Sequence, residues 1–342
     1  MGRERIVGGE QVEPSEDLTQ FSLRPALLKD FIGQKELRGK LDVLLEAARM
    51  RKEPVEHLLL YGPPGLGKTT LAHIISNEMD RRIISTSGPS LQRAGDLMGI
   101  LTNLKEGDIL FIDEIHRLSA VIEEFIYPAM EDFKVDFVVD KGAFAKVINV
   151  PLKRFTLIGA TTRAGMLSAP LRDRFGLYYH VDFYSTEELC KVVERSAKLL
   201  EISIDSAGAE IVAARSRGTP RVANRLLRRV RDYASVKADG KINADIAREA
   251  LDSEGIDSVG LDGMDRKLLE TIIKYYKGGP VGIEALGATL NEEVDTLVDM
   301  VEPFLLKIGF VKRTRRGRVV SQEAASHLGL SIDQGSQPSL FN

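Results

Sequence analysis

Hydrophobic and polar positions follow two different patterns along most of the chain. Between residues 21 and 182, short apolar runs alternate with stretches of helical spacing, which is typical of a mostly parallel α/β sheet. The apolar runs predict strands at 57–61, 109–112 and 155–160. Between residues 183 and 254 the spacing is helical and no strand is indicated. We therefore expect an α/β domain followed by a small all-helical domain.

A third unit is expected at 255–330. Apolar residues at helical spacing predict helices near 268–276, 281–288 and 291–306, and Pro303 implies a kink or break in the last of them. A short hairpin with basic residues at its turn follows. Three helices and a basic hairpin form the pattern of a winged helix-turn-helix domain.

Three further segments stand outside this regular pattern. Residues 133–150 read as two strands around a turn, and so predict a hairpin that projects from the α/β domain. Its predicted tip, 142–144, is apolar, which suits either ordinary packing or docking of a partner protein. The two ends, 1–20 and 331–342, are expected to be disordered.

Composition narrows the class of protein. The 342 residues suffice for about two to three domains. No run of 18 apolar residues predicts a membrane span, and the polar start of the chain lacks the apolar core of a secretory signal. Cys190 is the only cysteine, which excludes an intramolecular disulfide and a cysteine-cluster metal site. Together these features indicate a cytoplasmic protein.

The net charge of −3 hides two strongly basic segments. Residues 307–318 contain six cationic side chains and no acid, and residues 215–231 contain seven arginines and no acid. A polyanion responds to local charge more than to the total. Nucleic-acid binding is therefore compatible with this chain.

Residues 62–70, Gly-Pro-Pro-Gly-Leu-Gly-Lys-Thr-Thr, fit the pattern G-x-x-x-x-G-K-[ST] of a phosphate-binding loop. Its glycines allow closely spaced backbone N–H groups to converge on a nucleotide's phosphates. Lys68 is expected to reach the β- and γ-phosphates, and the Thr69 hydroxyl to hold Mg²⁺. An accidental glycine-rich turn is the alternative, but a predicted strand precedes the motif and a predicted helix follows it. The nucleotide-contacting residues expected here are Gly65, Gly67, Lys68, Thr69 and Thr70.

A second motif, Asp113-Glu114, ends a predicted buried strand. Both carboxylates then lie at the carboxyl edge of the sheet, where the phosphate loop also opens. Asp113 is expected to bind Mg²⁺, and Glu114 to accept a proton from the water that attacks the γ-phosphate. Taken alone, the pair could instead cap a following helix.

Three further polar positions follow in order. Thr162 comes after another predicted strand and is expected to position the attacking water, with Thr161 as a neighbour that caps instead. Arg174 is a candidate arginine finger for the nucleotide of a neighbouring subunit. Arg221 is placed at a helix start by Pro220, from where it can point back at the phosphates. For each arginine alone, a solvated surface charge is the alternative.

This ordered series resembles the AAA+ ATPases, and within them the RuvB family of Holliday-junction branch-migration ATPases. The resemblance covers about residues 20 to 330 and implies an α/β fold: a AAA+ P-loop parallel-sheet domain, a helical lid and a C-terminal winged helix. The matching segments are 21–25, 30–34, 61–70, 111–118, 127–132, 169–176, 218–221 and 309–318.

The resemblance implies ATP with Mg²⁺ as cofactors and a homohexameric ring around duplex DNA. It further implies Holliday-junction DNA, RuvA and RuvC as partners in recombination and repair, including the SOS response. The hairpin at 133–150 corresponds to the element that docks RuvA. Two positions depart from the family pattern: Arg315 stands in place of a proline, and Ser326 in place of an aromatic residue.

The resemblance also assigns site residues. Leu23, Arg24 and Tyr184 match positions at the adenine end of the nucleotide. Arg313 and Arg318 match winged-helix arginines that touch DNA. Further positions near the nucleotide are Glu131, Asp132 and Phe133.

The leading hypothesis is an ATP-driven motor on duplex DNA. Residues 312–318 carry five cations that would neutralise phosphates without reading sequence. A non-motor AAA+ switch, clamp-loader-like or regulatory, is the alternative. A protein remodeller is a third hypothesis, but no convincing aromatic pore loop occurs between residues 85 and 101.

Overall fold

The computed structural model describes residues 23–139 and 146–332. The predicted disordered N-terminus, most of the predicted C-terminal tail and the predicted apolar hairpin tip at 142–144 lie outside these ranges. Among the described residues, no helix combines the length and the apolar character needed to cross a membrane.

The first domain contains a five-stranded parallel sheet in the order β2-β3-β6-β1-β7. The three predicted strands are confirmed as β1 (Leu58–Tyr61), β3 (Ile109–Asp113) and β6 (Thr156–Thr161). Two strands that the apolar pattern does not indicate, β2 (Ile83–Ser87) and β7 (Leu177–His180), form the edges. Edge strands are partly exposed and tolerate polar residues, which explains their weak sequence pattern.

Helices cover both faces of this sheet. Along β3, Ile109 and Phe111 belong to one buried cluster, whereas Leu110 and Ile112 belong to the cluster on the other face. This alternation is what a strand buried on both faces produces, because successive side chains point to opposite faces. The helices of the domain are α2 (Lys35–Arg51), α3 (Lys68–Glu78), α4 (Ala94–Thr102), α5 (Ala120–Glu131) and α6 (Ala169–Arg172).

The second domain, the lid, consists mainly of helices. These are α7 (Thr186–Leu199), α8 (Ser206–Ala214), α9 (Pro220–Lys237) and α10 (Ala244–Ser253). The expectation that no strand occurs here is wrong in one detail. Two-residue strands β8 (Ser203–Ile204) and β9 (Lys241–Ile242) pair in parallel, and they are too short to leave a periodic pattern.

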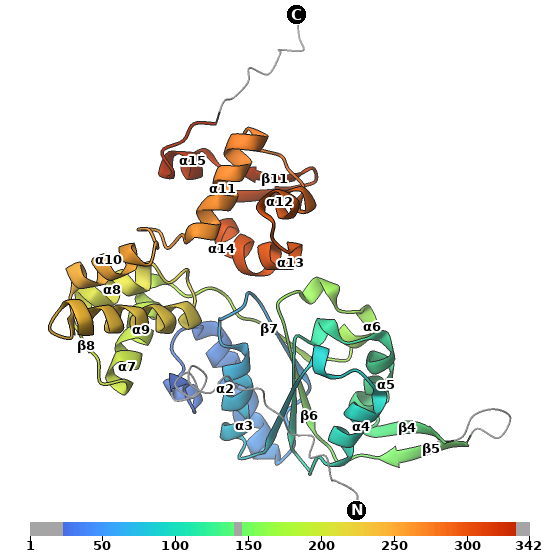
Figure 1. The fold of residues 1–342 in the computed structure, drawn as a ribbon. Coiled ribbons are helices and arrows are strands. Elements are labelled where there is room, and N and C mark those ends of the chain that lie inside the picture. Colours follow the sequence, from blue (N-terminus) through green and yellow to red (C-terminus); the bar gives the residue numbers. More distant parts are fainter. Residues whose placement is uncertain (1–22, 140–145, 333–342) are drawn as a thin grey trace, which may run out of the picture.

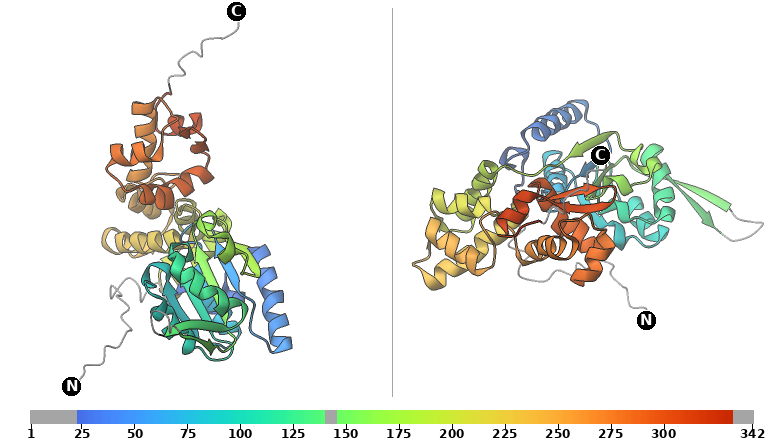
Figure 2. Two further views of the ribbon diagram at one scale, coloured as in Figure 1. Left: turned by 90° about the vertical axis from the view of Figure 1, so that its right-hand side faces the viewer. Right: turned by 90° about the horizontal axis from the view of Figure 1, so that it is seen from above.

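The third domain stands above the other two and has its own buried cluster (Figures 1 and 2). Its helices are α11 (Gly263–Tyr276), α12 (Ile283–Leu290), α13 (Val294–Thr296), α14 (Glu302–Lys307) and α15 (Gln322–His327), and its hairpin is β10 (Val311–Thr314) with β11 (Gly317–Val320). The winged helix-turn-helix pattern is thus confirmed.

The predicted third helix of this domain is interrupted, as Pro303 implies. A π-helical turn, Leu297–Val301, separates α13 from α14. Pro303 lies in the first turn of α14, where its missing N–H costs little. The wider π-turn therefore accommodates the proline in an otherwise continuous helical path.

The hairpin predicted at 133–150 is observed as antiparallel strands β4 (Lys134–Val139) and β5 (Lys146–Pro151). It extends away from the body of the first domain in both Figure 1 and the right-hand view of Figure 2. Val135 at its base is buried, whereas Ile148 is 47% exposed. The arms therefore carry an exposed apolar side chain far from the core.

Candidate nucleotide-binding site

The phosphate loop lies between β1 and α3. Its glycines Gly62, Gly65 and Gly67 have positive φ values of 144°, 78° and 99°. A Cβ on Gly62 would lie 2.2 Å from the carbonyl oxygen of Val181, so the loop needs glycine there. Gly67 directly precedes α3. The loop backbone is thus at a helix N-terminus, where N–H groups and the helix dipole favour an anion.

Lys68 is the buried cation of the loop, with 7% of the residue exposed. Its Nζ donates hydrogen bonds to the carbonyl oxygens of Gly62, at 2.7 Å, and Pro63, at 2.9 Å. Burial lowers the pKa of Lys68 to about 8, although the carboxylates of Asp113 and Glu114 oppose this shift. Neutral carbonyls are weaker acceptors than phosphate oxygens, so the ammonium is available to an anionic ligand.

Thr69 and Asp113 lie side by side at the end of β3. The Thr69 Oγ1 donates to Asp113 Oδ2 at 3.3 Å. Within the described ranges, no group of three or more His, Cys, Asp or Glu residues is arranged so that it could hold a metal ion. A single carboxylate and a hydroxyl suit Mg²⁺, which keeps several of its waters and is completed by phosphate oxygens. These two residues therefore fit the predicted metal.

Glu114 has a left-handed backbone, with φ of 49°. It precedes the 3₁₀ turn Ile115–Arg117, but within the described structure its side chain makes no capping hydrogen bond to that turn. The alternative, in which the Glu114 side chain caps the following helix, is therefore not observed. Burial and the neighbouring Asp113 raise the pKa of Glu114 above the ordinary glutamate value. A raised pKa is a property of carboxylates that act as general bases.

The two threonines at the end of β6, Thr161 within the strand and Thr162 directly after it, have different environments. The Thr161 hydroxyl accepts a hydrogen bond from the backbone N–H of Arg163, at 3.0 Å, and lies 2.9 Å from Nδ1 of His116. Thr162 Oγ1 is buried and has no hydrogen-bond partner among the described residues. It lines the same cleft as Glu114. An unpaired hydroxyl there is costly unless a ligand or water satisfies it.

His116 belongs to the segment 111–118, but nothing in the sequence pattern assigns it a role. The structure places its Nε2 3.5 Å from Glu114 Oε2, with 3% of the imidazole exposed. Burial and the Arg163 guanidinium lower the pKa of His116. The neutral ring therefore bridges the carboxylate and the Thr161 hydroxyl.

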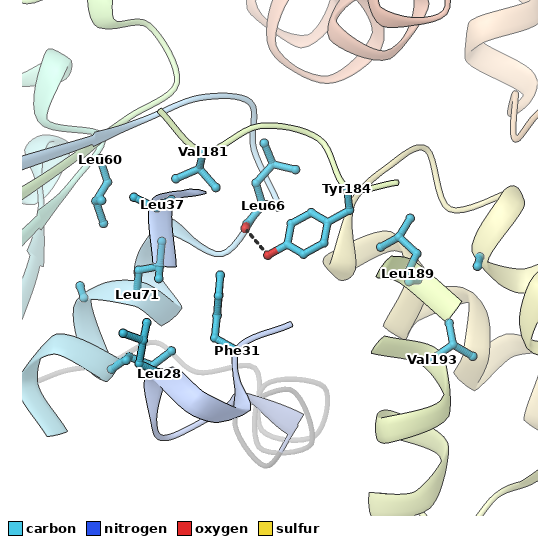
Figure 3. Close-up of a cluster of buried hydrophobic side chains, with 14 of the residues drawn as sticks. Leu28, Phe31, Leu37, Leu60, Leu66, Leu71, Val181, Tyr184, Leu189 and Val193 are labelled. Atoms are coloured by element: carbon cyan, nitrogen blue, oxygen red, sulfur yellow. Dashed lines mark hydrogen bonds between the residues drawn. The ribbon is translucent and has the colours of Figure 1, made fainter. Parts of the chain in front are cut away.

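The cleft between the first domain and the lid has a volume of about 410 Å³, within the range of small-molecule sites. Figure 3 shows Tyr184 between the two domains, with its Oη donating to the backbone oxygen of Leu66 at 3.3 Å. On the lid side, the Arg221 backbone N–H donates to Gly65 O at 3.4 Å. Predicted residues that line this cleft are Leu23, Arg24, Gly65, Gly67, Lys68, Thr69, Thr70, Asp113, Glu114, Thr162, Tyr184 and Arg221.

Sequence reasoning missed several lid residues in the cleft. Arg195 donates to the backbone oxygen of Leu23 at 2.7 Å, and Ser196 donates to Asn224 at 2.7 Å. All three lid residues line the cleft. Asn224 could have been found, because it is one helical turn after Arg221 on the same face of α9. Arg195 and Ser196 belong to an ordinary amphipathic pattern that contains no such indication.

Four predicted nucleotide residues lie outside this cleft. Arg174 donates to Glu131 Oε2 at 3.2 Å and to Pro170 O at 2.7 Å, and its guanidinium lies 4.3 Å from the ring centre of Tyr127. Asp132 directly follows Glu131, and Phe133 packs edge-on against Phe155. Within one chain, therefore, Arg174, Glu131, Asp132 and Phe133 form part of a different surface.

The predicted DNA-binding arginines of the wing share one buried carboxylate. Glu302 is fully buried, and both Arg313 Nη2 and Arg318 Nε lie 2.5 Å from its oxygens. Arg313 remains 47% exposed and Arg318 18%. Arg315, which departs from the family pattern, is exposed at the hairpin turn, and Ser326 is exposed on α15, so neither disturbs a buried contact.

Together these features define the class of protein: a AAA+ ATPase with a DNA-binding type of domain. The features are a phosphate loop and two carboxylates at one sheet edge, a helical lid over the cleft, and an attached winged helix. Comparison with known proteins is more specific. Residues 23–181 match the P-loop domain of the Holliday junction DNA helicase RuvB, residues 184–257 the RuvB AAA lid domain, and residues 258–329 the RuvB C-terminal winged-helix domain. The chain belongs to the RuvB family.

Solved structures agree with this assignment. Thermotoga maritima RuvB, described as a Holliday junction branch migration motor, is 51% identical; the match covers 91% of this chain and 99% of that one, with a TM-score of 0.84. A point mutant of the same protein is 50% identical over the same shares, with a TM-score of 0.85. The leading hypothesis, a branch-migration ATPase motor, is therefore confirmed, and the non-motor switch is not favoured.

Proposed function

We propose that the cleft binds ATP with Mg²⁺ and that its own residues carry out hydrolysis. Lys68 contacts the β- and γ-phosphates, and Thr69 with Asp113 holds the metal, which neutralises charge on the phosphates. Leu23, Arg24 and Tyr184 surround the adenine end. The observation that carries this proposal is the convergence of the glycine-rich loop, Lys68 and the Thr69–Asp113 pair in one cleft.

In this proposal Glu114 accepts the proton of the attacking water. Its raised pKa makes it a stronger base than an exposed glutamate, and the adjacent His116 ring fixes the orientation of the carboxylate. The unpaired hydroxyl of Thr162 supplies the hydrogen bond that positions the water. Arg221 reaches the phosphates from the lid, so lid position depends on the nucleotide.

Arg174 is proposed to act on the nucleotide of a neighbouring subunit in a homohexamer. The support is its location: it lies outside its own cleft, on a surface shared with Glu131. In a ring, this surface would face the next subunit's cleft and would bring Glu131, Asp132 and Phe133 near that nucleotide. Stabilisation of the transferring phosphoryl group by such an arginine is large, about 10³- to 10⁵-fold in rate in GTPases.

The winged helix is proposed to contact duplex DNA of the Holliday junction through Arg313 and Arg318, assisted by exposed cations of the same hairpin. Phosphate contacts carry no sequence code, which suits a motor that must cross every sequence. The β4–β5 hairpin is proposed as the docking element for RuvA, because it projects from the body and exposes Ile148. We further propose that RuvC is a partner and that the protein is located in the cytoplasm with the chromosomal DNA.

The test is branch migration of a synthetic four-way junction, with and without RuvA, by the wild type and by Glu114→Gln. We expect the variant to bind ATP normally and to lose about 10²- to 10⁴-fold in hydrolysis, the usual contribution of a general base. Branch migration should disappear with it. Retained turnover in Glu114→Gln would remove Glu114 from the mechanism.

A further inference from the structure

Arg163 joins the nucleotide cleft to the winged-helix domain. It follows Thr162 directly, yet its side chain points away from the cleft. Its Nε and Nη2 each donate to the carboxylate of Asp299 at 2.6 Å, and Nη2 also lies 3.0 Å from Asp295. Asp299 is 136 residues away in sequence. The contact is thus a bidentate ion pair between two domains.

The acceptor lies in a special part of the winged helix. Asp299 belongs to the π-helical turn Leu297–Val301. This turn and its neighbours α13 and α14 form the side of the winged helix that faces the first domain in Figure 1. Single π-turns inside α-helices are rare and occur frequently at functional sites.

The lid holds the same turn from a second direction. Arg217, four residues before Arg221, donates to the backbone oxygen of Met300 at 3.2 Å and to both carboxylate oxygens of Asp265, at 2.8 and 3.0 Å. Each domain that forms the nucleotide cleft therefore contributes one arginine to the segment 299–300.

The contact continues toward the wing. Glu302 is three residues after Asp299 and is the first residue of α14, which directly follows the π-turn. Glu302 in turn holds Arg313 and Arg318. Two sets of ion pairs, Arg163 with Asp299 and Glu302 with the arginines proposed to touch DNA, are thus joined by one short helical segment.

We propose that Arg163 is a positioning residue that couples the nucleotide state of the cleft to the winged helix through Asp299. The inference rests on the proposed function, because it takes Thr162 as the residue that meets the nucleotide. A shift of Thr162 toward a bound phosphate must move the adjacent Arg163, whose backbone N–H is tied to Thr161. The ion pair is partly exposed, at 21% for Arg163 and 31% for Asp299, so solvent can reach it while the domains stay docked.

The experiment uses the full-length protein with Asp295→Asn and Asp299→Asn combined, which keeps the size of both side chains. Three quantities are measured: ATP hydrolysis without DNA, duplex affinity, and branch migration per ATP hydrolysed. We expect the third to fall by about tenfold, the usual scale of coupling between sites, while the first two stay unchanged. Glu270→Gln is the matched control, because its carboxylate is in the same domain but its ion pair, with Lys274, stays within α11.

A charge swap, Arg163→Asp with Asp299→Arg, should recover part of the lost coupling relative to Arg163→Asp alone. Unchanged branch migration per ATP in the Asp295–Asp299 variant would overturn the proposal, as would an equal loss of DNA-free hydrolysis. Failure of the proposed function can be told apart from failure of this proposal. It would appear as retained hydrolysis in Glu114→Gln, whatever the result for the Asp295–Asp299 variant.

Discussion

At the scale of single residues, the site depends on groups whose ordinary chemistry is altered by burial. Lys68 is almost enclosed by its own loop, and desolvation disfavours its charged form. The pKa of Glu114 is raised instead of lowered, because burial and the charge of Asp113 both disfavour its carboxylate form. Thr162 has a hydroxyl with no partner in the described structure. In the proposed function, a Mg²⁺-bound nucleotide would give Lys68 an anionic partner, and the attacking water would give Thr162 the hydrogen bond that it lacks.

The lowered pKa of Lys68 gives a pH dependence to nucleotide binding. Below pH about 8 the ammonium is charged in the free protein, and above it the charge is lost. Binding of phosphate then requires uptake of a proton, so affinity should fall by up to about tenfold per pH unit above this value. Titration of a fluorescent nucleotide at a series of pH values from about 7 to about 10 measures the profile.

Lys68→Arg is the control for this measurement, because a guanidinium stays charged throughout. Its affinity is expected to be lower than that of the wild type and nearly independent of pH. If the wild-type affinity stayed constant up to the pKa of an ordinary lysine, burial would not set the pKa of Lys68 in solution.

At the scale of elements, the wing combines the arginines proposed to bind DNA with an internal ion cluster. Arg313 and Arg318 occupy opposite positions of the β10–β11 pair and reach the same Glu302. Their removal would leave that carboxylate buried and unpaired, which typically costs about 3–5 kcal/mol. A loss of DNA binding in Arg313→Ala with Arg318→Ala would therefore mix two effects, local unfolding and loss of charge.

Adding Glu302→Gln to that pair separates the two effects. The triple variant no longer holds the buried charge that the double variant leaves unpaired, so its melting temperature should be the higher of the two. DNA binding should stay weak in both, and the slope of log affinity against log salt should decrease by about 0.9 for each phosphate that is no longer neutralised. Filter binding over a salt series measures this slope. Recovery of duplex affinity in the triple variant would exclude direct contact by these arginines.

At the scale of the whole molecule, one chain keeps the two parts of the proposed site separate. The cleft holds the phosphate loop and the acidic strand end, whereas Arg174 lies on the surface with Glu131 and Tyr127. This separation favours a ring in which each cleft is completed by the next subunit. It also explains why hydrolysis in such a ring would depend on assembly.

Mixed rings test the completion of one cleft by another subunit. Arg174→Ala and Glu114→Gln proteins should each be inactive alone. Their mixture should regain hydrolysis, because an intact Glu114 in one subunit meets an intact Arg174 from its neighbour. A mixture of Lys68→Ala and Glu114→Gln is the control, since both defects lie in the cleft that a subunit provides for itself. An inactive first mixture would place the action of Arg174 within its own chain.

Most of the fold could be predicted because its central parts have strong periodicity. The strands at Leu58, Ile109 and Thr156 are buried on both faces and read as continuous apolar runs. The edge strands β2 and β7 could not be found in this way, because half of their surface faces solvent. The paired strands β8 and β9 are two residues each, shorter than any period.

The residues of the candidate site also form two groups, those that the sequence could locate and those that it could not. Lys68, Asp113 and Glu114 could be located because their chemistry needs fixed spacing to a loop or a strand end. Arg195, by contrast, is in a lid helix and reaches the cleft only because Tyr184 and its neighbours dock that helix on the first domain (Figure 3). Arg163 directly follows the predicted Thr162, but its partner Asp299 is 136 residues away in the sequence.

Linear spacing was sufficient to establish the order of domains, the phosphate loop, the acidic strand end and the basic wing, because each of these depends on residues that are close in the chain. The folded structure was needed for three further features. It shows that Thr162, among the described residues, has a buried hydroxyl without a hydrogen-bond partner. It also shows that Glu302 binds both wing arginines and that one π-turn receives two arginines from other domains. These arrangements depend on contacts between residues that are distant in the chain, and burial, rather than residue type, sets their energetics.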